Sequence, residues 1–327
     1  MTRYMISIQH TKQQLIELKI QYDIYSEQIE RLTYTKAIET DTLKIFQLEK
    51  QIEYKSKQRE ETYRKMEILE KIDASTKLYR ALLKLNYIEQ TKVFKQLTDK
   101  SHIGAFVIHG DQDHGQRWLL NRLVNQILLT PGESSISIAF YPQRSWNFHA
   151  VLREIGRQIG RNYPASVAEI VEVLYNAWQQ RTIVLIFRRV GTIHQELLQD
   201  LLEKFWCELA KKAASQPVVD SSFKLLLFLV DDDGVIDTWP FKCVEQVDTP
   251  LEPFLPVKFP RLTRIHSAEL KNWIDHEWDE LPVRVRSTPV EDILHQSGEG
   301  TPQLVLEHLC SLCDCDWSEM ENQWIKH

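Results

Sequence analysis

Residues 110–117, GDQDHGQR, carry the glycine spacing of a phosphate-binding loop. Gly110 and Gly115 enclose four residues, with the apolar run AFVIH before them and the helical pattern WLLNRLV after them. Glycines at these points let the backbone turn tightly, so that its N–H groups face a bound phosphate. The spacing therefore predicts a strand, a phosphate loop and a helix, in that order.

The two positions after Gly115 lack the side chains that nucleotide hydrolysis requires. An active loop continues with a lysine, which reaches the phosphates, and then with a serine or threonine, whose hydroxyl binds magnesium. These positions hold Gln116, which has no charge, and Arg117, which repels a cation. The residues favour a loop that has lost hydrolysis, with residual nucleotide or anion binding through Arg117 as the open alternative.

A second strand should supply an acidic residue that organises the metal and the attacking water. The run TIVLIFRRV, residues 182–190, is the third strand in order and ends in Arg188 and Arg189 instead. Two positive charges repel magnesium, so this acid strand is degenerate. We expect the two arginines to pair with an acidic residue at the end of the sheet, in preference to binding an anion.

The run KLLLFLVDDD, residues 224–233, offers acidic residues at the end of another strand. This run is the fourth strand in order, where folds of this kind place a sensor strand. We therefore interpret its acidic end, DDDG, as a solvated turn. An active ATPase that uses Asp231–Asp233 is the alternative hypothesis.

Short apolar runs alternate with helical patterns from residue 104 onward, which predicts a parallel sheet with helices on both faces. The predicted strands are residues 105–109, 136–141, 182–187, 223–230 and 257–262. The predicted helices between them are residues 117–129, 146–159, 167–180 and 194–213. Helical patterns alone follow Arg264. The predicted fold class is α/β, a P-loop NTPase-like parallel five-stranded sheet with a C-terminal helical lid.

The first 75 residues contain no proline or glycine and carry apolar residues at alternating steps of three and four. This spacing is the a/d pattern of a coiled coil. Its first run consists of Leu15, Leu18, Tyr22, Tyr25, Ile29 and Leu32. The segment IETDT offers Thr40, Asp41 or Thr42 as the cap of a second helix. We expect an antiparallel helical hairpin, with one continuous helix as the alternative.

The domain organisation follows from these patterns. Residues 1–75 form the predicted coiled-coil arm, and the segment DAST predicts the start of a connector helix over residues 76–100. Residues 101–264 form the predicted degenerate P-loop domain, and residues 265–327 form the predicted helical lid. A chain of 327 residues is long enough for about two domains of ordinary size.

Residues from about 101 to 315 resemble the STAND branch of the P-loop NTPases, and in particular the family called inactive STAND. The segments GAFVIHGDQDHGQRWLLNRL, TIVLIFRRV and GEGTPQLVLEHL carry the resemblance, and Gly300 and Pro302 match the landmarks of the lid motif. In that family both catalytic motifs are degenerate, and members occur in bacterial conflict systems beside effector-associated domains. The resemblance implies a pseudo-NTPase, and the N-terminal helices resemble the helical modules attached to such proteins.

Other residues with chemical potential fit structural roles. The segment HLCSLCDC, residues 308–315, gathers four soft ligands, but a tetrahedral metal site usually takes two separated ligand pairs. We expect Cys310 and Cys313 on a buried helix face and no metal. His109 and His114 flank the loop without the order of a catalytic triad. The tryptophans of the tail are interpreted as core residues, namely Trp273, Trp278 and Trp317.

The composition argues against several classes of function. The apolar run LLLFLV, residues 225–230, is far shorter than the roughly 20 residues that span a bilayer. Residues 1–100 carry 19 basic and 15 acidic residues, a net charge of only +4 with the signs interspersed, which argues against nucleic-acid binding. The five cysteines are few and odd in number, which indicates a reducing compartment. The N-terminus shows no signal-peptide core, so we expect a cytoplasmic protein.

These patterns together predict a non-hydrolysing adaptor or sensor scaffold. It would contact a protein partner, an effector or a regulator, through its N-terminal helices, and it could form a homo-oligomer. We expect no cofactor, nucleic acid or membrane partner. A switch that binds nucleotide without hydrolysing it is the first alternative, an active ATPase that uses Asp231–Asp233 is the second, and a nucleic-acid binder is the third.

Overall fold

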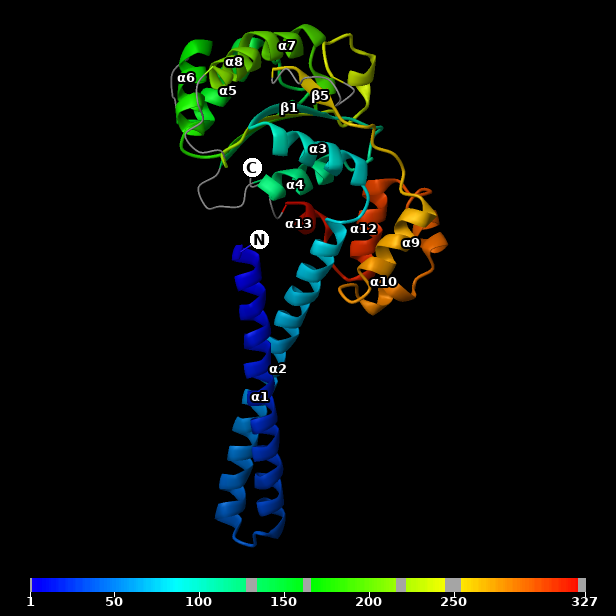
Figure 1. The fold of residues 1–327 in the computed structure, drawn as a ribbon. Helices are drawn as coiled ribbons and strands as arrows, with labels where there is room; N and C mark the ends of the chain where they lie inside the picture. The colour runs from blue at the N-terminus through cyan, green and yellow to red at the C-terminus, as the bar shows by residue number, and fades with distance from the viewer. Residues whose placement is uncertain (1, 128–133, 161–165, 216–221, 245–253, 323–327) are drawn as a thin grey trace. The chain divides into compact units, whose positions relative to one another are not determined.

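The computed structural model describes residues 2–127, 134–160, 166–215, 222–244 and 254–322. The chain divides into two compact units (Figure 1). One comprises Met1–Ala81 with Glu280–Pro282, and the other comprises Leu82–Asp279 with Val283–His327. The second unit therefore contains both the predicted P-loop domain and the helices of the predicted lid.

The first unit is built on an antiparallel pair of long helices (Figure 1), α1 (Thr2–Ile38) and α2 (Thr42–Leu82). Near the turn between them, the Nζ atom of Lys36 lies 2.7 Å from Oε1 of Glu49 on the facing helix. The predicted hairpin is confirmed, and the alternative of one continuous helix is wrong.

The turn between the two helices is fixed by Asp41. Its side-chain oxygen accepts a hydrogen bond from the backbone N–H of Leu43 at 2.9 Å, which satisfies one of the free donors at the start of α2. The predicted a/d residues of α1 are all partly buried. Ile16, Ile20 and Ile24 lie outside that stripe and are 55%, 55% and 47% exposed.

The predicted connector helix over residues 76–100 needs correction. The helix α2 continues without a break to Leu82, and the next helix is α3 (Ile88–Lys100). The Thr76 hydroxyl, which suggested a helix start, instead donates to the carbonyl oxygen of Ile72 at 2.7 Å inside the helix. Threonine side chains make this local bond within helices as readily as they cap them.

The second unit contains a five-stranded parallel sheet in the order β2-β3-β4-β1-β5. Its strands are β1 (Ile103–Ile108), β2 (Ser134–Ala139), β3 (Ile183–Arg188), β4 (Leu225–Val230) and β5 (Pro256–Lys258). Each predicted strand is present, with ends shifted by a few residues. The predicted fourth strand lies between the first and the third, so all three contribute to the centre of the sheet.

Helices cover both faces of this sheet (Figure 1). The helices α3 and α4 (Gln116–Ile127) lie on one face, and the other face carries α5 (Phe148–Gln158), α6 (Val167–Trp178), α7 (Gln195–Asp200) and α8 (Cys207–Ala214). A π-helical segment, η2 (Leu201–Trp206), joins α7 to α8. Each predicted helix is present, although Leu128 and Leu129 of the first lie outside the described residues.

Two apolar layers hold the sheet between its helices. On the α3 side, the ring of Phe94 lies 5.1 Å from that of Phe106 on β1 and 5.8 Å from that of Phe228 on β4. On the other side, alternate residues of β1, β3 and β4 are buried against α5–α8. A strand buried on both faces reads as a continuous apolar run, which is why LLLFLV contains no polar residue.

The C-terminal part of the described chain is helical, as predicted. It comprises α9 (Ser267–His276), α10 (Val283–Ser287), α11 (Val290–Gln296), α12 (Pro302–Leu312) and α13 (Trp317–Asn322). Trp273 is buried, but Trp278 is 47% exposed, so its assignment to the core was wrong. Its ring lies under the Arg286 guanidinium, at 5.1 Å, which gives the exposed indole a polar contact. Throughout the described ranges, no helix combines the length and the apolar character needed to cross a membrane.

Gly300 has a strict structural role in the turn before α12. Its φ angle is 84°, its carbonyl oxygen accepts the N–H of Ile265 at 2.8 Å, and a Cβ atom there would collide with the Ile265 carbonyl. Gly160 has a similar φ angle of 80°, but a Cβ atom there would meet nothing within 4 Å. Substitutions at these two glycines therefore distinguish the cost of a positive φ angle from the cost of a steric collision.

We predict that Gly300→Ala lowers the free energy of unfolding by about 2 kcal/mol or more. Gly160→Ala, the matched control, should cost about 1 kcal/mol, because it carries only the left-handed strain. Denaturant titration of the full chain measures both values. Equal losses in the two variants would show that the contact with Ile265 is not a constraint.

Candidate functional site

The candidate site lies where the central parallel strands end. In the pairing register, Ile108 of β1 and Arg188 of β3 both stand opposite Val230 of β4. Gly110, Arg188 and Asp231 therefore come together at the carboxyl edge of the sheet, where open α/β sheets bind ligands. The structure brings the two predicted degenerate motifs and the acidic run to one place.

The loop after β1 turns as the glycine spacing predicted. Asp113 and Gly115 have φ angles of 63° and 78°, and the N–H of Leu119 donates to the carbonyl oxygen of Gly115 at 2.9 Å as α4 begins. The backbone path therefore follows a strand, a tight turn and a helix start. What differs from a phosphate site is the set of side chains packed against this turn.

Tyr87 packs directly against the loop. Its hydroxyl donates a hydrogen bond to the carbonyl oxygen of His114 at 2.9 Å, and a Cβ atom on Gly115 would collide with that hydroxyl. The Tyr87 side chain is almost fully buried, and burial raises its pKa. Gly115 is therefore needed for the close approach of this tyrosine, as well as for its own positive φ angle.

A strained turn places Tyr87 there. Asn86 and Tyr87 both have positive φ angles, 59° and 58°, which is uncommon for residues other than glycine. A guanidinium nitrogen of Arg122 on α4 donates to the carbonyl oxygen of Asn86 at 2.6 Å. Burial lowers the pKa of Arg122 to about 10, which marks a guanidinium enclosed by protein. Such strain persists only where the surroundings fix it.

Gln116 takes the lysine position and turns back onto the protein. Its amide nitrogen donates to the carbonyl oxygen of Asp111 at 2.7 Å and lies 3.4 Å from that of Asp232 after β4. Gln116 is buried. Its side chain therefore ties the loop to the neighbouring strand end, in a position from which an active lysine would reach a phosphate.

Arg117 takes the hydroxyl position and forms an ion pair within the chain. Its guanidinium lies 2.8 Å from Oε2 of Glu321 on α13. Burial raises the pKa of Glu321, although the positive charges of Arg117 and Arg188 oppose that shift. The anion that the sequence suggested for Arg117 is thus supplied by the protein itself.

The charges of Asp232 and of the two arginines at the end of β3 act on one another, and the predicted pairing of these arginines with an acidic residue stays a prediction. The charge of Arg188 opposes the effect of burial on Asp232, whose pKa burial raises to about 6. Arg188 also acts on Glu321. Arg189 has a positive φ angle of 58°, and its guanidinium lies 5.4 Å from the centre of the Tyr141 ring.

The acidic run after β4 is a turn, but it is not solvated at its first residue. Asp231 is fully buried, and its carboxylate accepts the N–H of Ile236 at 2.8 Å and that of Asp233 at 3.3 Å. These bonds hold the turn that leads into the 3₁₀ helix η3 (Val235–Thr238), which contains Ile236. The prediction of a solvated turn is corrected for Asp231, because the sheet's end covers it.

The lid motif reaches the phosphate loop. The N–H of Gln303 donates to the carbonyl oxygen of Asp113 at 3.0 Å. A Cβ atom on Gly115 would lie 3.5 Å from Cβ of Pro302, which occupies the first turn of α12. Pro302 and Gly115, which the sequence singled out separately, therefore meet across the loop.

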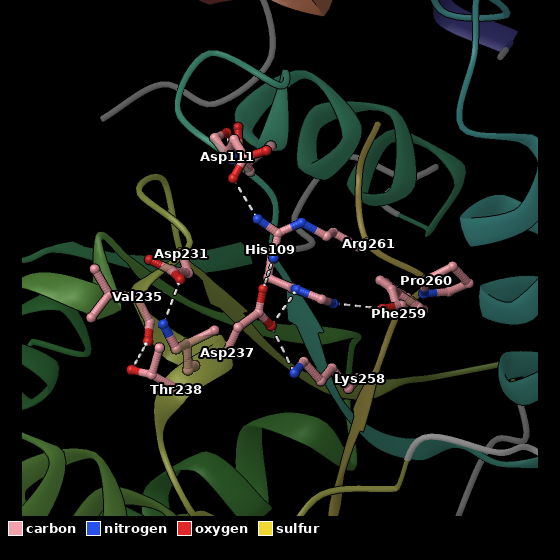
Figure 2. A network of polar contacts seen from close by, with 12 residues as sticks. His109, Asp111, Asp231, Val235, Asp237, Thr238, Lys258, Phe259, Pro260 and Arg261 are labelled. Carbon is pink, nitrogen blue, oxygen red and sulfur yellow. Dashed lines mark hydrogen bonds and ion pairs between the residues drawn. The ribbon is translucent and has the colours of Figure 1, made fainter. Parts of the chain in front are cut away.

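A polar network joins the loop to the strand end at β5 (Figure 2). The ring of His109 lies 2.7 Å from the Asp237 carboxylate and 2.8 Å from the carbonyl oxygen of Phe259. Lys258 also lies 2.7 Å from Asp237, and Arg261 bridges Asp237 to Asp111. Although burial raises the pKa of Asp237, hydrogen bonds from Lys258 and His109 outweigh it and hold that pKa below its usual range.

Of the two cysteines predicted on a buried helix face, Cys310 lies there, whereas Cys313 lies one residue past the end of α12. Cys310 is fully buried on α12, and Cys313 is partly buried at the end of that helix. Burial raises the pKa of the Cys313 thiol to about 12. Within the part of the chain that the structure describes, no three side chains of the metal-ligating types gather as a metal site would require.

Sequence reasoning missed the residues that fill the site. Tyr87 lies within the predicted connector helix, residues 76–100, and neither it nor Glu321 received a role in the site. Both lie far from the loop in sequence, by 27 residues between Tyr87 and His114 and by 204 between Arg117 and Glu321. No local pattern marks them, because their partners are set by the packing of α3 and α13.

Comparison with protein families confirms the resemblance for the first two of the three motif segments, and the segment with Gly300 and Pro302 lies outside the matched residues. Residues 82–230 match the family model described as inactive STAND. The match covers α3, the sheet from β1 to β4, and the helices between those strands. Its first residue, Leu82, is also the first residue of the second structural unit. No curated protein matches the sequence.

Solved structures with similar architecture are distant in sequence. Cdc6p from Pyrobaculum aerophilum is 11% identical, with a TM-score of 0.37 over 71% of this chain and 68% of its own. The ORC1 protein of Aeropyrum pernix, solved in complex with DNA, is 12% identical, with a TM-score of 0.36 over 71% and 63%. The ORC2 protein of Aeropyrum pernix, solved in ADPNP-ADP complexes, is 13% identical, with a TM-score of 0.41 over 75% and 71%.

We predict that Tyr87→Phe lowers the free energy of unfolding by about 1 kcal/mol, because the His114 carbonyl loses a buried donor. Tyr141→Phe is the matched control, since Tyr141 is 51% exposed. Denaturant titration of the full chain gives both values. A Tyr87→Phe variant as stable as the wild type would mean that the hydroxyl does not hold the loop.

The network around Asp237 predicts a pH dependence. A carboxyl whose pKa is lowered in the folded state stabilises that state above its unfolded pKa, and this contribution is lost as the pH falls through the folded value. Asp237→Asn should therefore destabilise the chain at pH 7, and the difference from the wild type should shrink below about pH 4. Thermal unfolding across this range measures it, with Asp275→Asn, an exposed position on α9, as the control. A difference that does not change with pH would contradict the role of the Asp237 charge.

Proposed function

We propose that this chain is a non-hydrolysing STAND-like scaffold that mediates protein–protein interactions. The observation that carries the proposal is that the protein's own side chains pack against the loop at the strand ends. Tyr87 packs against the turn, Gln116 is folded onto the backbone, and Arg117 is paired with Glu321. Nucleotide chemistry at this place would require a lysine, a hydroxyl and an open turn, and each of these positions serves the protein's own packing.

The acidic residues near the site support the same proposal. Asp231 caps a turn through two backbone N–H groups, so its carboxylate is committed to structure. Burial raises the pKa of Asp232 to about 6, and Arg188 neighbours it. A carboxylate that binds a metal must be ionised and must have room for the metal cation beside it. Here the positively charged guanidinium of Arg188 already lies near Asp232.

The N-terminal hairpin supports a role in protein contacts. Ile16, Ile20 and Ile24 recur every four residues on α1, so they share one face of the helix, and that face is about half exposed. Clustered apolar side chains on a protein surface mark interaction sites more often than isolated ones do. The proposed partner is an effector or a regulator that binds this hairpin, and the a/d pattern also allows a coiled coil with a second copy.

The proposal extends to a setting for this role. The scaffold would act in a bacterial conflict system, as an adaptor or sensor beside an effector. The support for this setting is the match over residues 82–230. The proposed scaffold would carry a signal by contact, without turnover of nucleotide.

The role of the hairpin is tested by quantitative capture from the native host with the full chain. We predict that Ile16→Glu/Ile20→Glu abolishes capture of the specific partner, because two charges replace the exposed apolar face. Lys19→Glu is the matched control: it changes the net charge by the same two units at an exposed position of the same helix and should retain the partner. Mass spectrometry compares the captured proteins. A set of partners that is identical for all three proteins would contradict the proposed docking face.

A further inference from the structure

The first helix of the hairpin is apolar on the side that faces away from the second helix. In α1, the partly buried stripe from Leu15 to Leu32 occupies the a and d positions of the heptad, so positions b, c and f point outward. Coiled coils are ordinarily polar at these outward positions. Five of them on α1 instead hold apolar side chains that are 47–70% exposed and that form the α1 outer face, namely Ile16, Ile20, Ile24, Tyr34 and Ile38.

The second helix carries a similar surface on its own far side. Its partly buried a and d residues include Ile45, Leu48 and Leu69. Positions f, c and g adjoin one another on the helix surface and hold four apolar side chains that are 49–67% exposed, which form the α2 outer face: Leu43, Tyr54, Ile68 and Ile72. The two outer faces lie on opposite flanks of the hairpin, so one partner helix cannot cover both.

The two outer faces carry opposite net charge. From residue 13 onward, the b, c and f positions of α1 hold four acidic residues and one basic residue, all exposed, with a net charge of −3: Glu17, Asp23, Glu27, Glu30 and Arg31. From residue 43 to residue 72, the f, c and g positions of α2 hold one acidic and six basic residues, all exposed, with a net charge of +5: Lys44, Lys50, Lys57, Glu61, Arg64, Lys65 and Lys71. The other glutamates of α2 lie at positions b and e, as do Phe46 and Tyr63.

Charge disfavours a symmetric pairing of identical outer faces. Two α1 outer faces would bring net charges of −3 together, and two α2 outer faces would bring net charges of +5 together. Like charges placed opposite one another across an interface repel, whereas an α1 outer face and an α2 outer face attract. A contact between two different faces is heterologous, so it repeats from copy to copy in a ring or an open filament.

Contacts within the hairpin define which positions share a height along it. Lys36 faces Glu49, and the rings of Tyr22 and Tyr63 lie 6.1 Å apart, so the two residue numbers add up to 85 in both contacts. The same relation holds between neighbouring copies that lie side by side in one orientation.

This relation brings matching residues of two neighbouring copies to the same height. Ile16 of one copy falls at the height of position 69 in the next copy, beside Ile68 of the α2 outer face. Glu27 falls at the height of position 58, beside Lys57. Apolar residues therefore meet apolar residues, and an acidic residue meets a basic one.

We propose that copies of this chain stack head to tail through the hairpin, with the α1 outer face of one copy covered by the α2 outer face of the next. The inference rests on the proposed function, since it names a second copy as an occupant of the face on which the proposed effector or regulator docks. An open stack leaves one α1 outer face uncovered at its end, where that partner binds. Self-association and partner binding therefore compete for the α1 outer face.

Sedimentation velocity of the purified full chain over a series of concentrations tests the proposal. The weight-average mass of the wild type should rise with concentration beyond that of two copies, because one copy cannot cover both outer faces of another. Reversing the charge of either face alone should return the mass to that of the monomer, since both faces then carry the same sign. The α1 reversal is Glu17→Lys/Asp23→Lys/Glu27→Lys, and the α2 reversal is Lys57→Glu/Lys65→Glu/Lys71→Glu.

A chain that carries both reversals separates charge pairing from general damage. Its outer faces again have opposite net charges, so its mass should rise with concentration as that of the wild type does. The matched control is Glu53→Lys/Glu67→Lys/Glu70→Lys, which changes the net charge as the α1 reversal does but at exposed positions outside both outer faces. The control should associate like the wild type. Circular dichroism verifies that each variant is as helical as the wild type.

Several results would overturn the stacked arrangement. A wild-type chain that stays monomeric at every concentration would leave the outer faces to a different protein. A mass that stops at two copies, or an association that survives the α2 reversal, would indicate a symmetric pair of α1 faces. Loss of association in the control, or a helical double-reversal chain that does not associate, would mean that these charges do not set the pairing.

The α2 reversal also distinguishes a failure of this inference from a failure of the proposed function. It leaves the α1 outer face intact, so it should still capture the partner from the native host while it no longer self-associates. Association that behaves as described, together with capture that is unaffected by Ile16→Glu/Ile20→Glu, would retain the stack and contradict the docking face.

Discussion

Charged groups gathered at the end of a buried sheet must find partners, because an unpaired charge is costly in a medium of low polarity. In an enzyme of this architecture, nucleotide and magnesium would supply those partners. Here Arg117 pairs with Glu321, and Asp231 accepts hydrogen bonds from the backbone N–H groups of Asp233 and Ile236. These contacts between charged groups and their partners within the chain hold α13 and the turn after β4 against the loop.

The same constraint links the loop to the C-terminal helices. In the second unit, the loop contacts α12 through Gln303 and Asp113, and α4 contacts α13 through Arg117 and Glu321. Tyr87 supports the loop from its other neighbour, the turn before α3. Each of these contacts is made by the chain with itself, so the arrangement needs no bound ligand to hold it.

The fold was more predictable from the sequence than the site. Apolar runs and turn residues predict the positions of the strands along the chain, because their signals are local, and Gly110, Gly115 and Pro302 follow a known spacing. The prediction of a helix start near residue 76 was wrong, because the Thr76 hydroxyl donates a hydrogen bond inside the helix that it was expected to begin. Glu321 was missed since its importance arises from a contact 204 residues away. Contacts between residues far apart in the sequence carry no motif, and only the packed structure identifies them.

The central claim is that this site has lost hydrolysis and is held together by its own side chains. Release of inorganic phosphate from ATP, measured with the full chain in the presence of magnesium, tests it most directly. The account predicts a rate equal to that of a blank without protein, with Asp232→Asn indistinguishable from the wild type. Magnesium-dependent phosphate release by the wild type that disappears in Asp232→Asn would contradict it and establish an ATPase that uses the acidic run after β4.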